Sequence, residues 1–406
     1  MPTRQRVILM FALTGAMLGA GALANYLLNP YGAWRATLID PIFRHVEQER
    51  IVTPYLLRSA HPETLLLGSS RVLRGMRIDQ GERDGVMNGA LNGATIRQLS
   101  QVVSLALENP RLKRIVWGVD FFSFEQKWDR DRPDFDARMA GSLSARFEDT
   151  LLSFDALASG LDELHRAMRG AAKLQPTQTS ALPWPMPLVC SDLESNRRRG
   201  LARTPQDEIV AQAVNVLRYY DGYRFSPEFF DTFRATIEAA RRHGVETIVF
   251  VPPMSGYELE LIRQTGNWAA FQEWKRRLAE LGPFWDFSGY NEIGLSDTGF
   301  IDVIHFKPAI GQVILRKLLA DPIEPCSGLA QIVAADALRV DGAGIEAMLA
   351  RQDAMRRAAT VDASRFSQLA AQAIALRSHQ TTDAADDSAA NDDANGQAPA
   401  MLTRRR

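Results

Sequence analysis

The chain has 406 residues, of which 46% are hydrophobic and 23% are charged, enough to bury one large core or two smaller ones. Its formal net charge of -1 provides no overall basic field, which argues against a nucleic-acid partner. The two cysteines, Cys190 and Cys326, belong to no CxxC pair or His/Cys cluster, so nothing points to a structural zinc site. A disulfide between them is an open option for an exported chain.

The N-terminus contains a segment for targeting or anchoring. Arg4 and Arg6 precede an uncharged stretch from Val7 to Leu28 that is long enough to cross a bilayer as a helix. Positive charge on the near side predicts a cytoplasmic N-terminus and a chain that is otherwise periplasmic or extracytoplasmic. Ala22-Leu23-Ala24 also fits a signal-peptidase site, so residues 1–29 are either a retained membrane anchor or a cleaved signal of a secreted form.

Beyond a connector at 30–63, strands and helices are predicted to alternate. Short apolar runs bounded by turn residues indicate buried strands, and apolar residues at helical spacing indicate helices. This alternation predicts an α/β fold whose parallel sheet is covered by helices on both faces. Strands are expected at 64–67, 114–120, 245–251 and 284–287 and one ending at 88; helices are expected at 96–107, 227–242, 258–281 and 309–319.

Two stretches depart from this pattern. Between 125 and 205 the regularity is lost, which predicts an insert in an α/β domain at 64–322; the insert is either a lid or docking element or a surface excursion without function. Residues 323–377 are rich in Ala, Leu, Met and Arg and predict a helical extension that offers a surface for a protein partner. Residues 378–406 are dominated by Asp, Ala and Asn and predict a disordered tail.

Polar residues at the ends of these segments are candidates for chemistry. Ser70 follows the first strand closely, at the carboxyl ends of the strands, where open α/β proteins bind ligands. At the start of a helix, Ser70 would have free N–H groups that stabilise negative charge; alternatively, the Gly-Ser-Ser run only caps that helix. In the last loop, Asp302 precedes His305 by three residues. This spacing lets a carboxylate orient an imidazole that acts as the base for a serine nucleophile.

Three segments together resemble the SGNH, or GDSL-like, hydrolase superfamily: Gly68-Ser69-Ser70, the loop from Asn88 to Gly93, and Asp302 to His305. The resemblance covers roughly 64–319 apart from the insert. It implies a three-layer α/β/α, flavodoxin-like sheet, with Ser70 as nucleophile, His305 as base and Asp302 as its orienting partner. It also implies an oxyanion hole made by the N–H groups of Ser70 and Gly93, and it requires no metal or organic cofactor.

The sequence departs from the family pattern in two places. Ser69 stands where many members carry Asp. The third block, Gly-x-Asn-Asp, is reduced to Gly118-Val119-Asp120, so the asparagine of the oxyanion hole is replaced by Val119. The side chain of Asn92 is the candidate replacement donor. A missing oxyanion donor lowers the rate on the order of a hundredfold or more.

The N-terminal anchor makes the chain similar to the envelope-associated branch of this superfamily, which moves or removes O-acyl groups, commonly acetyl, on polysaccharides. We therefore expect a serine esterase or O-acyltransferase that acts on a cell-envelope or exported polysaccharide through an acyl-Ser70 intermediate. The alternative is a catalytically inactive SGNH-like scaffold or binding subunit of an envelope polysaccharide assembly, an interpretation that Val119 supports.

Three charged residues near Ser70 are candidates for contacting the substrate. Arg71 and Arg74 would hold an acidic sugar or a carbonyl oxygen, or would instead form a salt bridge on the helix face. Asp120 is a candidate for orienting the loop that carries Ser70. Aromatic residues beside buried strands more commonly belong to the core, but four of them also offer surfaces for stacking sugars: Trp117, Phe121, Phe122 and Trp285.

Overall fold

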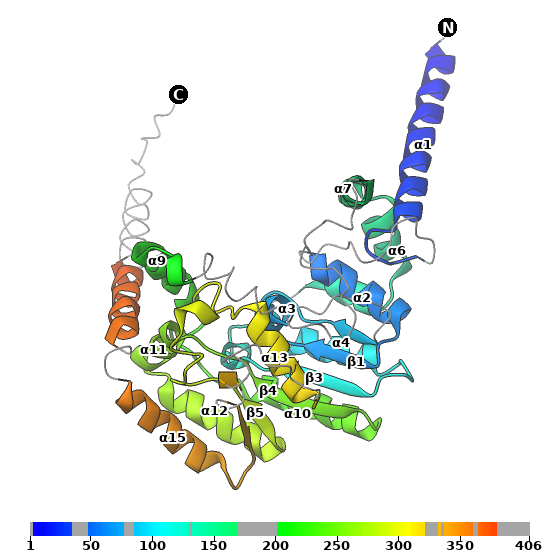
Figure 1. The fold of residues 1–406 in the computed structure, drawn as a ribbon. Helices are drawn as coiled ribbons and strands as arrows, with labels where there is room; N and C mark the ends of the chain where they lie inside the picture. The colour runs from blue at the N-terminus through cyan, green and yellow to red at the C-terminus, as the bar shows by residue number, and fades with distance from the viewer. Residues whose placement is uncertain are drawn as a thin grey trace, which may run out of the picture.

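The computed structural model describes residues 3–34, 48–76, 85–129, 132–168, 201–320, 332–333, 337–359 and 364–379. They form a mixed α/β fold around one six-stranded sheet, with an apolar N-terminal helix that rises away from it (Figure 1). Cys190, Cys326 and the predicted tail beyond His379 lie outside the described residues.

The sheet confirms the expectation of a mostly parallel α/β arrangement. Its order is β2-β1-β3-β4-β5-β6, and only β6 runs antiparallel to its neighbour. In β1, Leu65, Leu66 and Leu67 are fully buried, because helices cover both faces of the sheet. The strands are β1 (Thr64–Leu67), β2 (Val86–Asn88), β3 (Arg114–Gly118), β4 (Glu246–Val251), β5 (Phe284–Asp286) and β6 (Leu338–Val340).

Two consecutive residues of β3 show that helices lie on opposite faces. Trp117 packs edge-on against Phe233 of α10 (Pro227–Arg242), with ring centroids 4.8 Å apart. A side chain at Gly118 would instead meet Val72 of α3 (Ser70–Gly75). Successive strand residues point to opposite faces, so α3 and α10 lie on opposite sides of the sheet. Beside α10 packs α4 (Ile96–Ala106), and beside α3 packs α13 (Pro308–Leu318).

Serine and threonine side chains fix where several of these helices begin. Each accepts a hydrogen bond from a backbone N–H in the first turn, which satisfies a donor that the helix leaves unpaired. The capping residues are Ser69 for α3, Thr95 for α4, Ser226 for α10 and Ser255 for α11 (Gly256–Gln264). The expected single helix over 258–281 is wrong: a left-handed turn at Gly266 ends α11, and α12 (Trp268–Leu281) follows.

The segments before β1 and within the insert pack together. The N-terminal helix α1 (Thr3–Leu28) is 26 residues long and apolar enough to cross a membrane. The connector contains an unexpected helix, α2 (Glu49–Ala60), which packs against α4 and the insert. The described part of the insert consists of α5 (Pro133–Met139), α6 (Leu143–Arg146), a π-helical turn η4 (Phe147–Leu151) and α7 (Phe154–Met168). Beyond it, α9 (Gln206–Leu217) leads back to the sheet.

The C-terminal extension is more than surface helices. Its residues Leu338 to Val340 form β6 and pair with Phe284 to Asp286 of β5. The helix α15 (Ile345–Ala358) and a further helix at 364–379 follow. Phe366 is 1% exposed and packs edge-on against Tyr257 of α11. The extension therefore belongs to the α/β body, and its three-residue strand is too short to produce a recognisable alternation.

Candidate active site

The side chains of Ser70, His305 and Asp302 form one hydrogen-bonded chain. His305 Nε2 lies 2.8 Å from Ser70 Oγ, and His305 Nδ1 lies 2.7 Å from Asp302 Oδ2 and 2.9 Å from its Oδ1. These distances are those of a hydroxyl, a base and a carboxylate that orients the base. Ser70 and His305 are both buried, so their contact is shielded from bulk water. The arrangement can move a proton from the serine hydroxyl to the imidazole.

Ser70 occupies the point in the sheet where the chain changes direction. From β1 the chain goes first to β2 on one side and then to β3 on the other, and ligands bind outside the carboxyl ends of strands at such a point. Gly68 makes the turn into α3 with φ +154°, and an added Cβ there would collide with Val72 and lie 2.9 Å from Gly118 O. Only glycine fits this turn, which then delivers Ser70 as the first residue of α3.

His305 is held by a compact loop between η8 (Asp297–Gly299) and α13. Ile301 N–H donates to His305 O at 2.8 Å, and the Asp302 carboxylate also accepts the N–H groups of Ile304 and His305. Burial alone would raise the pKa of Asp302, but the His305 ring and these N–H groups outweigh it, so the pKa is lowered. The carboxylate is therefore ionised at neutral pH and suited to orient the imidazole.

Close contact between α3 and α13 brings the serine and histidine loops together. A Cβ added at Gly311 of α13 would overlap the carbonyl of Gly75 at the end of α3, and one at Gly75 would overlap the Phe306 ring. Since Phe306 directly follows His305, this contact sets the distance between the histidine loop and the helix that begins with Ser70. Larger residues at either glycine would separate the two loops.

Arg71 and Asp120 do not lie where a substrate contact requires them, which corrects the sequence-based interpretation. The Arg71 side chain is 2% exposed, and its Nε lies 3.2 Å from Asp120 Oδ1. Its guanidinium also pairs with Glu258 of α11, and Tyr220 donates a hydrogen bond to the same carboxylate. This buried cluster of Arg71, Asp120, Glu258 and Tyr220 holds the first turn of α3 against β3 and α11. Sequence reasoning missed Glu258 and Tyr220, since nothing local to either residue points toward Ser70.

The cluster contains more acid than base. Burial raises the pKa of Asp120, opposed by the Arg71 guanidinium, the Ser69 hydroxyl and the charge of His305. Burial likewise raises the pKa of Glu258, opposed by Arg71 and Tyr220. Asp120 is thus within electrostatic reach of His305. The interpretation of Asp120 as a residue that orients the serine loop agrees with this position.

The loop after β2 runs beside the serine loop. Leu91 N–H donates to Gly68 O at 3.0 Å. Gly93, two residues further along the loop, has a φ of +55°. Asn88 is buried and ties the loop to α3, because its amide nitrogen donates to Met76 O at 2.9 Å and Val72 O at 3.3 Å. Its side-chain oxygen accepts the N–H of Ala90 within the loop. The loop is therefore fastened both to the serine turn and to the end of α3.

The remaining site candidates lie around this loop. Asn92 is exposed, and its backbone is held by Glu49 and Arg50 of α2. Val119 is buried, and its N–H donates to Phe250 O in β4 at 2.9 Å, so the position where the resemblance to SGNH hydrolases leads us to expect an asparagine is an apolar core site. Arg74 is partly exposed on α3, and its side chain makes no hydrogen bond or ion pair with the residues that the structure describes.

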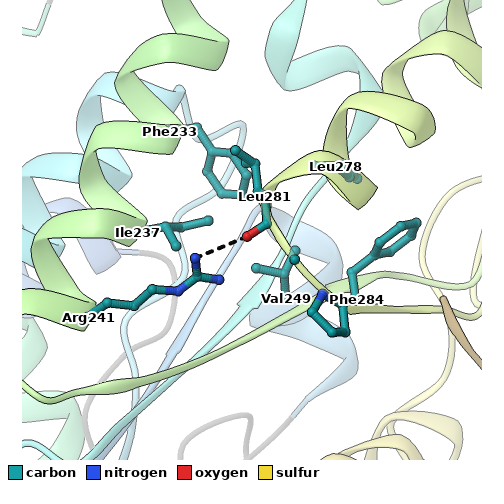
Figure 2. Close-up of a pocket in the computed structure, with 9 residues that line it drawn as sticks. Phe233, Ile237, Arg241, Val249, Leu278, Leu281 and Phe284 are labelled. Atoms are coloured by element: carbon teal, nitrogen blue, oxygen red, sulfur yellow. Dashed lines mark hydrogen bonds between the residues drawn. The ribbon is translucent and has the colours of Figure 1, made fainter. Parts of the chain in front are cut away.

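The aromatic residues considered for sugar stacking do not form an open surface beside Ser70. Trp117, Phe121 and Phe122 are at most 2% exposed, so these three rings are core and not surfaces for stacking sugars. Trp285 is partly buried and packs against the core. A hollow of about 10 Å³ between α10 and α12 is barely large enough for one water molecule (Figure 2). Arg241 crosses it to donate to Leu281 O at 3.0 Å. This hollow lies where α10 and α12 end and lead into β4 and β5, so it is at the amino ends of the strands, whereas Ser70 is at the carboxyl ends.

No protein-family model matches the chain, and no curated protein matches its sequence. Within the described ranges, no group of three or more His, Cys, Asp or Glu side chains is arranged to hold a metal ion.

Proposed function

We propose that this chain is a serine-dependent esterase or O-acyltransferase that acts on a cell-envelope or exported polysaccharide. The observation that carries the proposal is the chain of hydrogen bonds from Ser70 through His305 to Asp302. Its location at the switch point of a parallel sheet supports the same interpretation, because catalytic groups in such sheets gather at the carboxyl ends of the strands.

We further propose that the α/β domain is SGNH-like and that its substrate is an acylated polysaccharide. The order β2-β1-β3-β4-β5 is the flavodoxin-like order, which is what the resemblance to SGNH hydrolases implies. The helix α1 supports attachment to a membrane, with the α/β domain in the periplasm as the proposed side. A membrane-attached SGNH-like domain fits an acylated envelope polymer better than a soluble metabolite.

In the proposed reaction, His305 Nε2 takes the proton of Ser70 Oγ as that oxygen attacks the acyl carbonyl carbon. The tetrahedral intermediate collapses by breaking the bond to the alkoxy group, which leaves as an alcohol with the proton from His305. Water or a sugar hydroxyl then gives its proton to His305 and attacks acyl-Ser70, and the proton returns to Ser70 Oγ. Asp302 keeps the proton of neutral His305 on Nδ1 and stabilises the imidazolium.

The oxyanion of each intermediate requires donors, for which we propose the N–H groups of Ser70 and Gly93. The first N–H groups of a helix have no carbonyl partner within the helix, and Ser70 is the first residue of α3. With valine at 119, the exposed amide of Asn92 is the proposed third donor. The alternative function, an inactive scaffold of an envelope assembly, is favoured by one observation, the apolar surroundings of Val119.

The test is labelling of the full chain by a fluorophosphonate, together with turnover of a small acetyl ester. Both are expected in the wild type and in Ser69→Ala, which keeps the nucleophile, and both should vanish in Ser70→Ala and His305→Ala. Adding an oligosaccharide acceptor separates the two activities, since a transferase yields acylated sugar and an esterase yields free acid. A folded wild-type chain that neither reacts with the probe nor hydrolyses the ester would favour the scaffold.

A further inference from the structure

Exposed apolar side chains are concentrated in one short segment of the insert. Outside α1, the described part of the chain has eight large hydrophobic side chains that are exposed, and six of them lie between 143 and 168. Phe154 is 80% exposed and Met168 is 71% exposed. A soluble surface rarely gathers such residues without an occupant for them. The six are Leu143, Phe147, Leu152, Phe154, Leu161 and Met168.

On α7 these side chains form a line along one face. Phe154, Leu161 and Met168 follow one another at intervals of seven residues, which returns to nearly the same side of an α-helix. Asp155 and Asp162 are also exposed and lie about a quarter-turn away. The helix is therefore amphipathic, with an apolar face that is not turned into the core of the protein.

The same segment holds the end of α1. The Asn25 amide nitrogen donates to Leu151 O and Ser153 O, both at 3.0 Å, and Leu28 packs closely against Gly160 of α7. Figure 1 shows α6 and α7 gathered at the lower end of α1, with α7 viewed nearly along its axis while α1 is seen from the side. A bilayer crossed by α1 would therefore meet α7 lying across the direction of the anchor.

Aromatic residues also cluster beside the C-terminal end of α1. Tyr26 near the end of α1 and Phe147 of η4 both pack against Trp34, with ring centroids 5.9 and 5.6 Å apart. The guanidinium of Arg146 lies over the Trp34 ring at 3.8 Å. Tryptophan and tyrosine concentrate at the boundary between lipid and water, and arginine extends its charge toward head groups there.

We propose that residues 143–168 form an interfacial element that inserts its apolar side chains into the bilayer that α1 crosses, in the leaflet beside Leu28. The proposal does not depend on catalysis at Ser70; it requires that α1 stays in the membrane. Two attachments, one spanning and one lying in the interface, would then fix the orientation of the α/β body. Amphipathic helices of this kind sit about 5–10 Å into the boundary between head groups and acyl chains.

The test uses the full chain in phosphatidylcholine nanodiscs, with one copy in each disc. Mass spectrometry verifies that α1 has not been cleaved off. After Cys190→Ser and Cys326→Ser, a fluorescent NBD label is placed through Phe154→Cys or Leu161→Cys, and through Asp155→Cys or Asp162→Cys as matched controls. Lipids with a doxyl group on the acyl chain are expected to quench the first pair, whose emission shifts to the blue. Iodide in the water should quench only the second pair.

Two results would overturn the proposal. Labels at 154 and 161 that are open to iodide and unaffected by doxyl lipids would place the face in water. Labels shielded from both quenchers would mean that protein covers it. As a second variant, Phe154→Ser with Leu161→Ser should abolish lipid quenching of a label introduced through Met168→Cys. This variant should leave the melting temperature unchanged, because both side chains are exposed.

Discussion

His305 Nε2 lies 2.8 Å from the hydroxyl oxygen of Ser70, although the two residues are 235 positions apart in the sequence. The contact depends on three separate features: the turn at Gly68, the compact loop that ends at Lys307, and the contact of Gly75 with α13. None of them is needed merely to cap a helix. Their convergence on one serine is the reason to test catalysis before any other activity.

Asp302→Asn should lower kcat for an acetyl ester on the order of 10³–10⁴-fold while the chain stays folded. The amide can still accept the N–H groups of Ile304 and His305, so the loop keeps its shape. It can no longer favour the tautomer with the proton on Nδ1. Steady-state kinetics beside a thermal melt measure both effects, and an unchanged kcat would remove Asp302 from the mechanism.

Arg71→Met should destabilise the fold by about 3–5 kcal/mol, since it leaves the buried carboxylates of Asp120 and Glu258 without their cation. Arg74→Met is the matched control on the same helix and should stay within about 0.5 kcal/mol of the wild type. Urea unfolding measures both free energies. Equal effects of the two substitutions would contradict the bracing role of the cluster.

Two asparagines of the loop after β2 should respond differently. Asn88→Ala removes hydrogen bonds to Val72 O, Met76 O and Ala90 N, and should cost about 1–3 kcal/mol of unfolding free energy. Asn92→Ala should leave stability within about 0.5 kcal/mol but lower kcat on the order of a hundredfold if its amide supplies an oxyanion donor. Asn92→Ala with wild-type kcat would eliminate that role.

Acid should loosen the attachment of the C-terminal extension. Glu260 of α11 accepts hydrogen bonds from Tyr290 and from Arg356 of α15, at 2.9 and 2.7 Å. Burial would raise its pKa, but Arg263, Gln264, Tyr290 and Arg356 lower the pKa to about 2. A lowered carboxyl pKa stabilises the folded state above the unfolded-state pKa, and this contribution disappears as the pH falls through about 2.

The contribution of Glu260 to the free energy of unfolding is on the order of 3 kcal/mol, since a tenfold change in proton affinity corresponds to about 1.4 kcal/mol. Glu260→Gln should therefore be less stable than the wild type at pH 7, and the difference should shrink as the pH is lowered from about 4.5 toward 2. Urea midpoints at several pH values measure this convergence. A difference independent of pH would mean that ionisation of Glu260 does not stabilise the fold.

Strands β1 to β5 and the candidate residues Ser70, Asp302 and His305 could be predicted because each leaves a local pattern in the sequence. An apolar run that ends in Gly-Ser-Ser indicates the carboxyl end of a strand, and a carboxylate three residues before a histidine indicates a pair in which the carboxylate orients the imidazole. The role of Arg71 could not be predicted, because its partner Glu258 is 187 positions away. Ser255 and Glu258 match the Ser-x-x-Glu pattern of a capping box. In that motif the glutamate side chain normally bonds within the first turn of its own helix, so the sequence does not indicate a contact with Arg71.

The antiparallel strand β6, in the C-terminal extension, covers an edge of the sheet. Without residues 338–340, the backbone of Phe284 to Asp286 in β5 would become an open edge. Such edges pair readily with the edges of other molecules. A version shortened after α13 would keep Ser70 and His305 yet gain a surface prone to self-association, so any shortened version should extend at least through α15.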